Sequence, residues 1–114
     1  MYEIKKISDK IVNISLTRGD SFFLQVNLTK GDEPFTPEEG SSLRFAFKRK
    51  YTDPIDTALV KSIPISTQLL ELKPEDTKPY PMKKDYVYEI AYIDAAGHED
   101  TFLKGTFTLT EEVV

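Results

Sequence analysis

The sequence has no cysteine and no tryptophan, and its 114 residues include a single histidine. Without cysteine the chain can form no disulfide, no thiolate nucleophile and no cysteine-type zinc site. No stretch approaches the roughly 20 apolar residues of a membrane helix or the about 7–15 of a signal-peptide core. We therefore expect no membrane insertion, no secretion signal and one domain over residues 1–114 whose core depends on apolar burial alone.

Basic residues are also fewer than acidic residues. The chain has 15 lysines and arginines against 19 acidic residues, which gives a formal net charge of −4. Nucleic-acid binding through counterion release needs a clustered basic face, and the one basic run, residues 44–50, is short. We expect no nucleic-acid partner.

The residues that are abundant favour strands. Seven Phe and six Tyr accompany many Val, Ile and Thr, the residue types that suit a half-buried pleated surface. Apolar and polar residues alternate or form short apolar runs in several segments, and these predict strands: 11–17, 21–28, 43–50, 58–65, 68–72, 84–94 and 99–110. Pro74 opens a segment that predicts a single helical turn. The pattern indicates an all-β antiparallel sandwich of about six to eight strands with at most one short helical turn.

The last two predicted strands form a long hairpin whose turn carries two conflicting register signals. Residues 94–97, Asp-Ala-Ala-Gly, match a type I turn with glycine in the left-handed position, which sets Ile90 opposite Phe102. A loop one residue longer sets Ile90 opposite Leu103 and pairs apolar with apolar and acid with base on every rung. Such pairs contribute about 0.2–1 kcal/mol each, so we expect the longer loop, with a bulge near the glycine as the way to satisfy both signals.

In the longer-loop register Gly105 lies opposite Tyr88 and leaves room for its ring. The predicted core face of the hairpin is Tyr86, Tyr88, Ile90, Tyr92, Leu103, Phe107 and Leu109. The opposite face is too apolar for open water. We predict that this face contacts another protein. The candidate contact residues, with Phe23 added from outside the hairpin, are Phe23, Val87, Ala91, Ile93 and Phe102. The alternative is that the N-terminal segment with Ile4 and Ile7, or the proline-rich connector 78–85, covers this face.

Candidate chemistry is sparse. His98 lies near Asp94, Glu99 and Asp100, but neighbouring strand residues point to opposite faces and converge poorly on a metal. Acidic pairs in loops are typical of solvated surface, and the sequence has no Gly-x-Ser-x-Gly elbow and no phosphate-binding glycine loop. The tripeptide 18–20, Arg-Gly-Asp, is best interpreted as a turn between two strands. We predict no catalytic, cofactor-binding or metal-binding residues, and no enzyme activity.

A family resemblance extends over most of the chain. It rests on Leu-Thr-Arg-Gly-Asp-Ser-Phe at 16–22, Leu-Arg-Phe-Ala-Phe-Lys-Arg at 43–49, Leu-Lys-Pro-Glu-Asp-Thr at 72–77 and the hairpin with Gly97 and Gly105. These segments resemble the N-terminal domain of the baseplate upper protein in phages and prophages of Gram-positive bacteria. The resemblance implies an immunoglobulin-like sandwich, a structural role in a phage tail or baseplate, and a location in the virion or the host-cell cytoplasm.

Two functions remain open from the sequence. The first is a non-enzymatic structural module that binds other proteins, either a second copy of itself or other tail and baseplate subunits, through the apolar face of its hairpin. The second is a β-sandwich that binds a glycan or another cell-surface ligand, for which an exposed aromatic platform is needed. The tyrosine row of the hairpin is more simply interpreted as core.

Overall fold

We analysed a computed structural model, which describes residues 2–6, 11–26, 28–30, 33–54 and 58–110. One single-turn helix is present in these ranges, α1 (Pro74–Thr77). The strands in chain order are β1 (Tyr2–Lys6), β2 (Val12–Thr17), β3 (Phe22–Gln25), β4 (Thr29–Lys30), β5 (Glu33–Pro34), β6 (Ser42–Lys48), β7 (Leu59–Ile63), β8 (Leu69–Leu72), β9 (Lys83–Ile93) and β10 (Glu99–Thr110).

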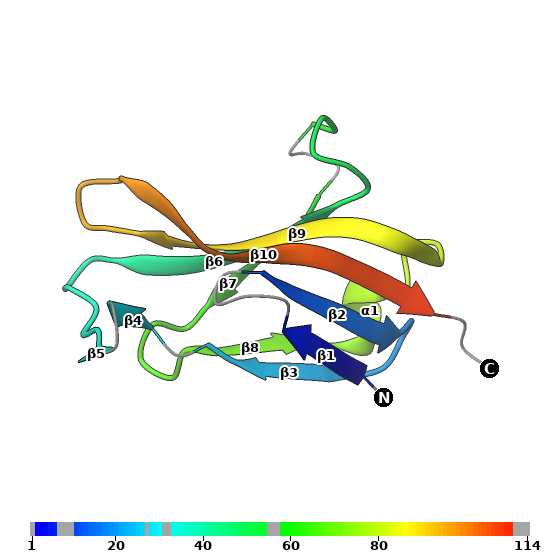
Figure 1. The fold of residues 1–114 in the computed structure, drawn as a ribbon, viewed down its shortest axis with the longest axis horizontal. Helices are drawn as coiled ribbons and strands as arrows, with labels where there is room; N and C mark the ends of the chain where they lie inside the picture. Colours follow the sequence, from blue (N-terminus) through cyan, green and yellow to red (C-terminus); the bar gives the residue numbers. More distant parts are fainter. Residues whose placement is uncertain (1, 7–10, 27, 31–32, 55–57, 111–114) are drawn as a thin grey trace.

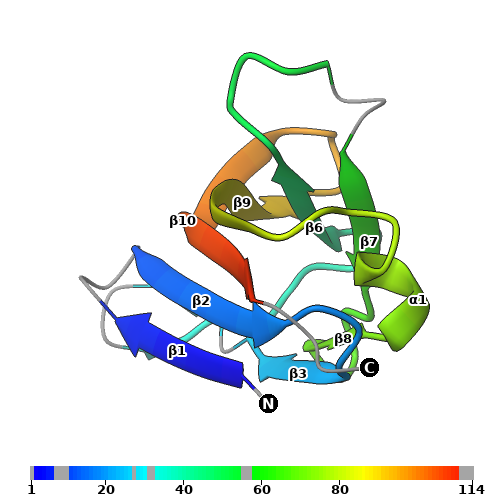
Figure 2. The same ribbon diagram turned by 90° about the vertical axis from the view of Figure 1, so that its right-hand side faces the viewer.

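The strands form two layers, so the predicted all-β sandwich is confirmed (Figures 1 and 2). A six-stranded sheet has the order β1-β2-β10-β9-β6-β7, and the two-stranded sheet β3-β8 packs below it. The remaining pair, β4-β5, is a ribbon of two-residue strands. The expectation of a purely antiparallel sheet is wrong at one place, because β2 runs parallel to β10. The alternation in the sequence predicts strands but not the direction in which they pair.

The hairpin β9–β10 satisfies both register signals in different parts of its length. At the tip, the Gly97 amide donates to the Asp94 carbonyl at 3.0 Å, and Gly97 has a φ of +91°, as in the three-residue loop. Thr101 lies opposite Ala91 there, whereas from Leu103 to Phe107 the pairing is that of the longer loop, and a second shift sets Leu109 opposite Lys83. The shift between Thr101 and Leu103 is a bulge. The prediction of a longer loop is therefore wrong at the tip of the hairpin, but the strand pairing predicted with it is correct in the body of the hairpin.

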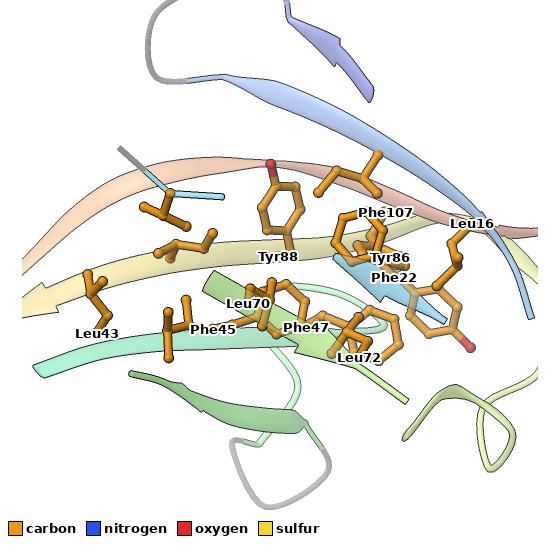
Figure 3. Packing of buried hydrophobic residues seen from close by; sticks show 14 of the residues in the cluster. Leu16, Phe22, Leu43, Phe45, Phe47, Leu70, Leu72, Tyr86, Tyr88 and Phe107 are labelled. Atoms are coloured by element: carbon orange, nitrogen blue, oxygen red, sulfur yellow. The ribbon is translucent and has the colours of Figure 1, made fainter. Parts of the chain in front are cut away.

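Aromatic rings fill the space between the two sheets (Figure 3). The Phe107 ring is completely buried and lies 5.3 Å from the Phe47 ring and 6.1 Å from each of the rings of Phe22, Phe45 and Tyr88. Most of these contacts are edge-to-face, the arrangement that aromatic quadrupoles favour. Five of the seven predicted core residues of the hairpin are buried, whereas Tyr92 and Leu103 are half-buried at its margin.

Gly105 marks the place where β2 enters the sheet. A Cβ on Gly105 would overlap the Val12 carbonyl oxygen and lie 2.9 Å from its carbon. That same oxygen accepts a hydrogen bond of 2.5 Å from the buried Tyr88 hydroxyl, and the Thr106 amide donates to the Asn13 side chain at 3.1 Å. The glycine lies opposite Tyr88 as predicted. Its purpose differs from our expectation, because it gives space to the backbone of β2 rather than to the tyrosine ring.

The Arg-Gly-Asp tripeptide joins the turn after β2 to the segment after α1. Gly19 adopts a φ of +85°, which glycine allows without strain, and its amide donates to the Thr77 hydroxyl at 2.9 Å. The Arg18 guanidinium donates to the Tyr80 carbonyl at 2.6 Å and to the Lys78 carbonyl. The interpretation as a turn is confirmed, and the arginine of the tripeptide is occupied within the domain.

Candidate functional site

The predicted contact residues do not all lie together. The outer face of the six-stranded sheet, the side turned away from β3 and β8, includes Val87, Ala91 and Ile93 of β9, which alternate with the buried Tyr88 and Ile90. Phe23 is 45% exposed but belongs to β3, where it points away from the core on the opposite surface of the sandwich. Phe102 is the bulged residue and packs against the core. Three of the five residues are therefore brought together.

In the part of the chain that the structure describes, neither of the predicted covers lies across this outer face. β1 pairs with β2 at the edge of the sheet, and Ile4 is exposed there. In the connector, Tyr80 packs against the core residues Phe47 and Tyr86. Ile7 lies outside the described residues. The cover predicted from the connector is therefore wrong, because the connector completes the core instead.

An ionic network crosses the outer face instead. Arg44 of β6 donates to Glu99 at 2.9 Å and to Glu89 at 3.4 Å. Ala91 of β9 is the cross-strand partner of Arg44 and is only 1% exposed. The pKa of Glu99 is lowered by the hydrogen bond and the charge of Arg44, and the pKa of Arg44 is raised mainly by its hydrogen bond with Glu99. The centre of the face is thus charged, and only its margins are apolar.

We expect the Arg44–Glu99 pair to make a pH-dependent contribution to stability. The pKa of Glu99 in the folded chain lies below its ordinary value of 4.5, so the contribution is complete above that pH and is lost as the pH falls through the folded value. Glu99→Gln should therefore be less stable than wild type at pH 7, and the difference in stability should shrink as the pH falls below the ordinary pKa of Glu99 and through its folded value. Urea midpoints measured from pH 3 to 7 test this. Glu75→Gln, at an exposed site on α1, is the control, and an equal pH dependence for both variants would contradict the prediction.

The connection between β6 and β7 adds an aromatic side chain that the sequence analysis overlooked. Residues 49–54 stand out from the outer face, away from β3 and β8 (Figures 1 and 2). Tyr51 in this loop is 63% exposed. The Lys48 ammonium donates to the carbonyl groups of Tyr51 and Asp53, each at 3.2 Å, and the Asp53 amide donates to the Lys50 carbonyl at 3.1 Å. The loop is therefore braced from within.

Tyr51 separates two hollows on the outer face. The larger has a volume of about 580 Å³ and is lined by loop residues together with residues from the start of β9: Arg49, Lys50, Tyr51, Asp53, Asp85 and Val87. Lys83 also lines it and forms an ion pair of 2.5 Å with Asp85. The smaller hollow, about 380 Å³, lies between Tyr51 and Glu89, Thr101 and Lys104. We call the larger hollow the loop hollow.

The histidine of the hairpin belongs to its turn. The His98 amide donates to the Asp94 carboxylate at 2.8 Å, and its ring nitrogen Nδ1 lies 3.1 Å from the same carboxylate. These bonds lower the pKa of Asp94, the backbone bond contributing most, while the His98 side chain remains 83% exposed. The interpretation of His98 as part of a solvated turn is confirmed.

The acidic pair 75–76 also has a local role. The Asp76 carboxylate accepts a hydrogen bond of 2.8 Å from the Lys73 amide at the start of α1 and forms an ion pair of 3.2 Å with Lys61.

Within the described ranges, no three residues among His, Asp and Glu come together as a metal-binding group. The same ranges contain no helix that is long and apolar enough to cross a membrane. The arrangement on the outer face is suited to hydrogen bonding and ion pairing.

Comparisons with known proteins give no family assignment. No model of a known protein family matches the chain, and a search of curated proteins finds no significantly similar relative.

Proposed function

We propose that this chain is a non-enzymatic protein-binding module that docks through the outer face of its six-stranded sheet, with a second copy of the chain as the simplest partner. The observation that carries the proposal is the composition of this face. Val60 and Tyr51 are exposed, Val87 and Ile93 are half-buried, and no described strand packs over them. Tyrosine and arginine, such as Tyr51 and Arg44 here, are enriched in protein interfaces.

The charges of the outer face favour self-association. Arg44 and Lys104 lie on the same face as Glu89 and Glu99. A two-fold symmetric interface must be complementary to itself, which a face with both signs of charge can achieve by placing each cation opposite a carboxylate of the other copy. The same pattern suits a different subunit with mixed charges, and either partner would cover the apolar margins.

A place in a phage or prophage tail follows from the sequence resemblance and is part of the proposal. The order β10-β9-β6-β7, with β3-β8 on the opposite side, supports the immunoglobulin-like topology that the resemblance implies. In variable-type immunoglobulin sheets the strands G, F, C and C′ are neighbours in that order, and B and E belong to the other sheet. Modules of this kind bind through sheet faces or loops and need no catalytic group.

Self-association can be tested by light scattering after size exclusion over a range of concentrations. We expect wild type to form dimers at high concentration and Ile93→Asp to remain monomeric with a nearly unchanged circular dichroism spectrum, because Ile93 is only half-buried at the margin of the face. Phe23→Asp, on the opposite surface of the sandwich, should dimerise like wild type. A wild type that stays monomeric at millimolar concentration, or a Phe23→Asp variant that loses the dimer while Ile93→Asp retains it, would contradict the proposal.

A further inference from the structure

The loop hollow combines three kinds of group that a sugar acid would use. Its lining includes the exposed aromatic residue Tyr51, the apolar residue Val87 and charged residues of both signs. An aromatic ring face packs well against the C–H groups of a sugar ring, and the rim groups can bind its hydroxyls. A volume of about 580 Å³ lies within the roughly 300–1,000 Å³ of small-molecule sites and suits one or two sugar rings.

The charges in the hollow favour an anionic ligand. Arg49, Lys50 and Lys83 outnumber the two carboxylates, Asp53 and Asp85, although the whole chain is acidic. Lys83 is paired with Asp85, whereas neither Arg49 nor Lys50 forms an ion pair with any described residue. Among the described residues, these two cations need not break an ion pair before they bind an acidic group.

The carboxylates in the same hollow discriminate between kinds of anion. Asp53 and Asp85 can accept hydrogen bonds from hydroxyl groups, which a sugar supplies and an acidic peptide side chain does not. They also repel a ligand that carries charge along its whole length, such as a nucleic-acid backbone. A ring with several hydroxyls and one acidic group satisfies the cations, the carboxylates and the aromatic residue together.

The loop is shaped before a ligand arrives. The Lys48 ammonium donates to the carbonyl groups of Tyr51 and Asp53, and the turn closes through the hydrogen bond from the Asp53 amide to the Lys50 carbonyl. A braced loop loses little conformational entropy on binding, which favours even a weak ligand. The braced segment stays within residues 48–53, and the rest of the lining comes from residues of β9.

We propose that the loop hollow is a binding subsite for an acidic sugar, in which Arg49 and Lys50 bind the acidic group, Tyr51 stacks against the ring, and Asp53 and Asp85 accept from its hydroxyls. Tyr51 and Val87 line the hollow and also belong to the outer face, whereas Ile93, at the other end of β9, does not line the hollow. Ile93→Asp therefore tests self-association without changing the lining of the hollow, and either proposal can fail alone.

The test is a set of titrations of the full chain monitored by backbone amide shifts. The probes are D-glucuronate, glucose 6-phosphate, D-glucose, inorganic phosphate and a hexaglutamate peptide. We expect at least one of the two acidic sugars to bind with a dissociation constant of about 1–10 mM and to shift amides of residues 49–53 and 85–87. A comparison of the two acidic sugars shows whether the hollow binds a carboxylate or a phosphate group more tightly. Glucose and phosphate alone should bind at least about five-fold more weakly.

Variants separate the sugar subsite from a simple charged patch. Tyr51→Ala should weaken acidic-sugar binding about five- to ten-fold, and Arg49→Ala with Lys50→Ala should do the same. Phe23→Ala, an exposed aromatic on the opposite surface, and Lys78→Ala, an exposed cation beyond α1, should leave binding unchanged. The proposal is overturned if neither acidic sugar shifts the loop amides, if phosphate or hexaglutamate binds as tightly as the acidic sugars, or if binding is unaffected by Tyr51→Ala.

Discussion

Gly105→Ala is expected to cost about 3 kcal/mol or more, enough to leave much of the chain unfolded. The new Cβ would collide with the main chain of Val12, which cannot move away as the end of a flexible side chain could. Displacing β2 would also break the buried hydrogen bond from Tyr88 to the Val12 carbonyl, and an unpaired buried carbonyl costs about 1–3 kcal/mol. The measurement is urea unfolding monitored by circular dichroism.

Gly97→Ala is the matched control for this substitution. Gly97 favours glycine for a different reason, its φ of +91°, and nothing lies within 4 Å of the position that a Cβ would take. Its cost should be the backbone strain alone, about 1 kcal/mol. If Gly105→Ala costs no more than Gly97→Ala, the approach of β2 does not require a glycine at position 105, and our account of how β2 joins β10 is wrong.

Phe107→Ala is expected to destabilise the domain by about 3–5 kcal/mol, because it removes a fully buried ring and leaves a cavity. Phe107 contacts aromatic rings from both layers, among them Phe22 of the small sheet and Phe47 of the large one. The loss is comparable with the whole stability of many domains of this size, about 5–15 kcal/mol. We therefore expect a thermal midpoint lowered by more than about 10 °C.

The control for the core substitution is Phe23→Ala, which removes the same side chain from the outer surface of β3. Because Phe23 is exposed, its loss should cost less than about 1 kcal/mol. A Phe107→Ala variant with a thermal midpoint close to that of Phe23→Ala would show that side-chain packing between the two sheets is not the main source of stability.

Alternation in the sequence located most of the fold. Segments such as 11–17 and 43–50 alternate because one side of each strand faces the core, and the structure forms β2 and β6 there. The pattern did not reveal β1, because its charged residues hide any apolar period, and it did not show that β2 pairs in parallel with β10. Pairing direction depends on contacts between distant segments, which a local pattern does not contain.

The hairpin shows why register could be predicted only in part. Local turn chemistry decides the pairing near Gly97, and cross-strand matching decides it from Leu103 inward. Each signal was correct over its own range, and the bulge at Phe102 is the physical compromise between them. That bulge also turns Phe102 toward the core, so a residue predicted for the contact face became part of the packing.

The candidate site depended on long-range geometry more than on residue type. Val87, Ala91 and Ile93 share a face because of strand alternation, which the sequence shows directly. That Arg44 spans this face, and that Tyr51 stands beside it, depends on how β6 and its following loop lie against β9. Tyr51 could have been noticed as an aromatic in a polar loop, but nothing in its neighbours indicates which face the loop overhangs.

Concentration-dependent amide shifts test the central claim, that the outer face of the six-stranded sheet is the docking face. Spectra recorded from micromolar to millimolar concentration should show shifts that cluster on β9 and β10 around Ala91, Ile93 and Thr101 and on Arg44 of β6. Residues of β3 and β8 should stay unchanged. Shifts that cluster on β3 and β8, or a spectrum that does not change with concentration, would contradict the account.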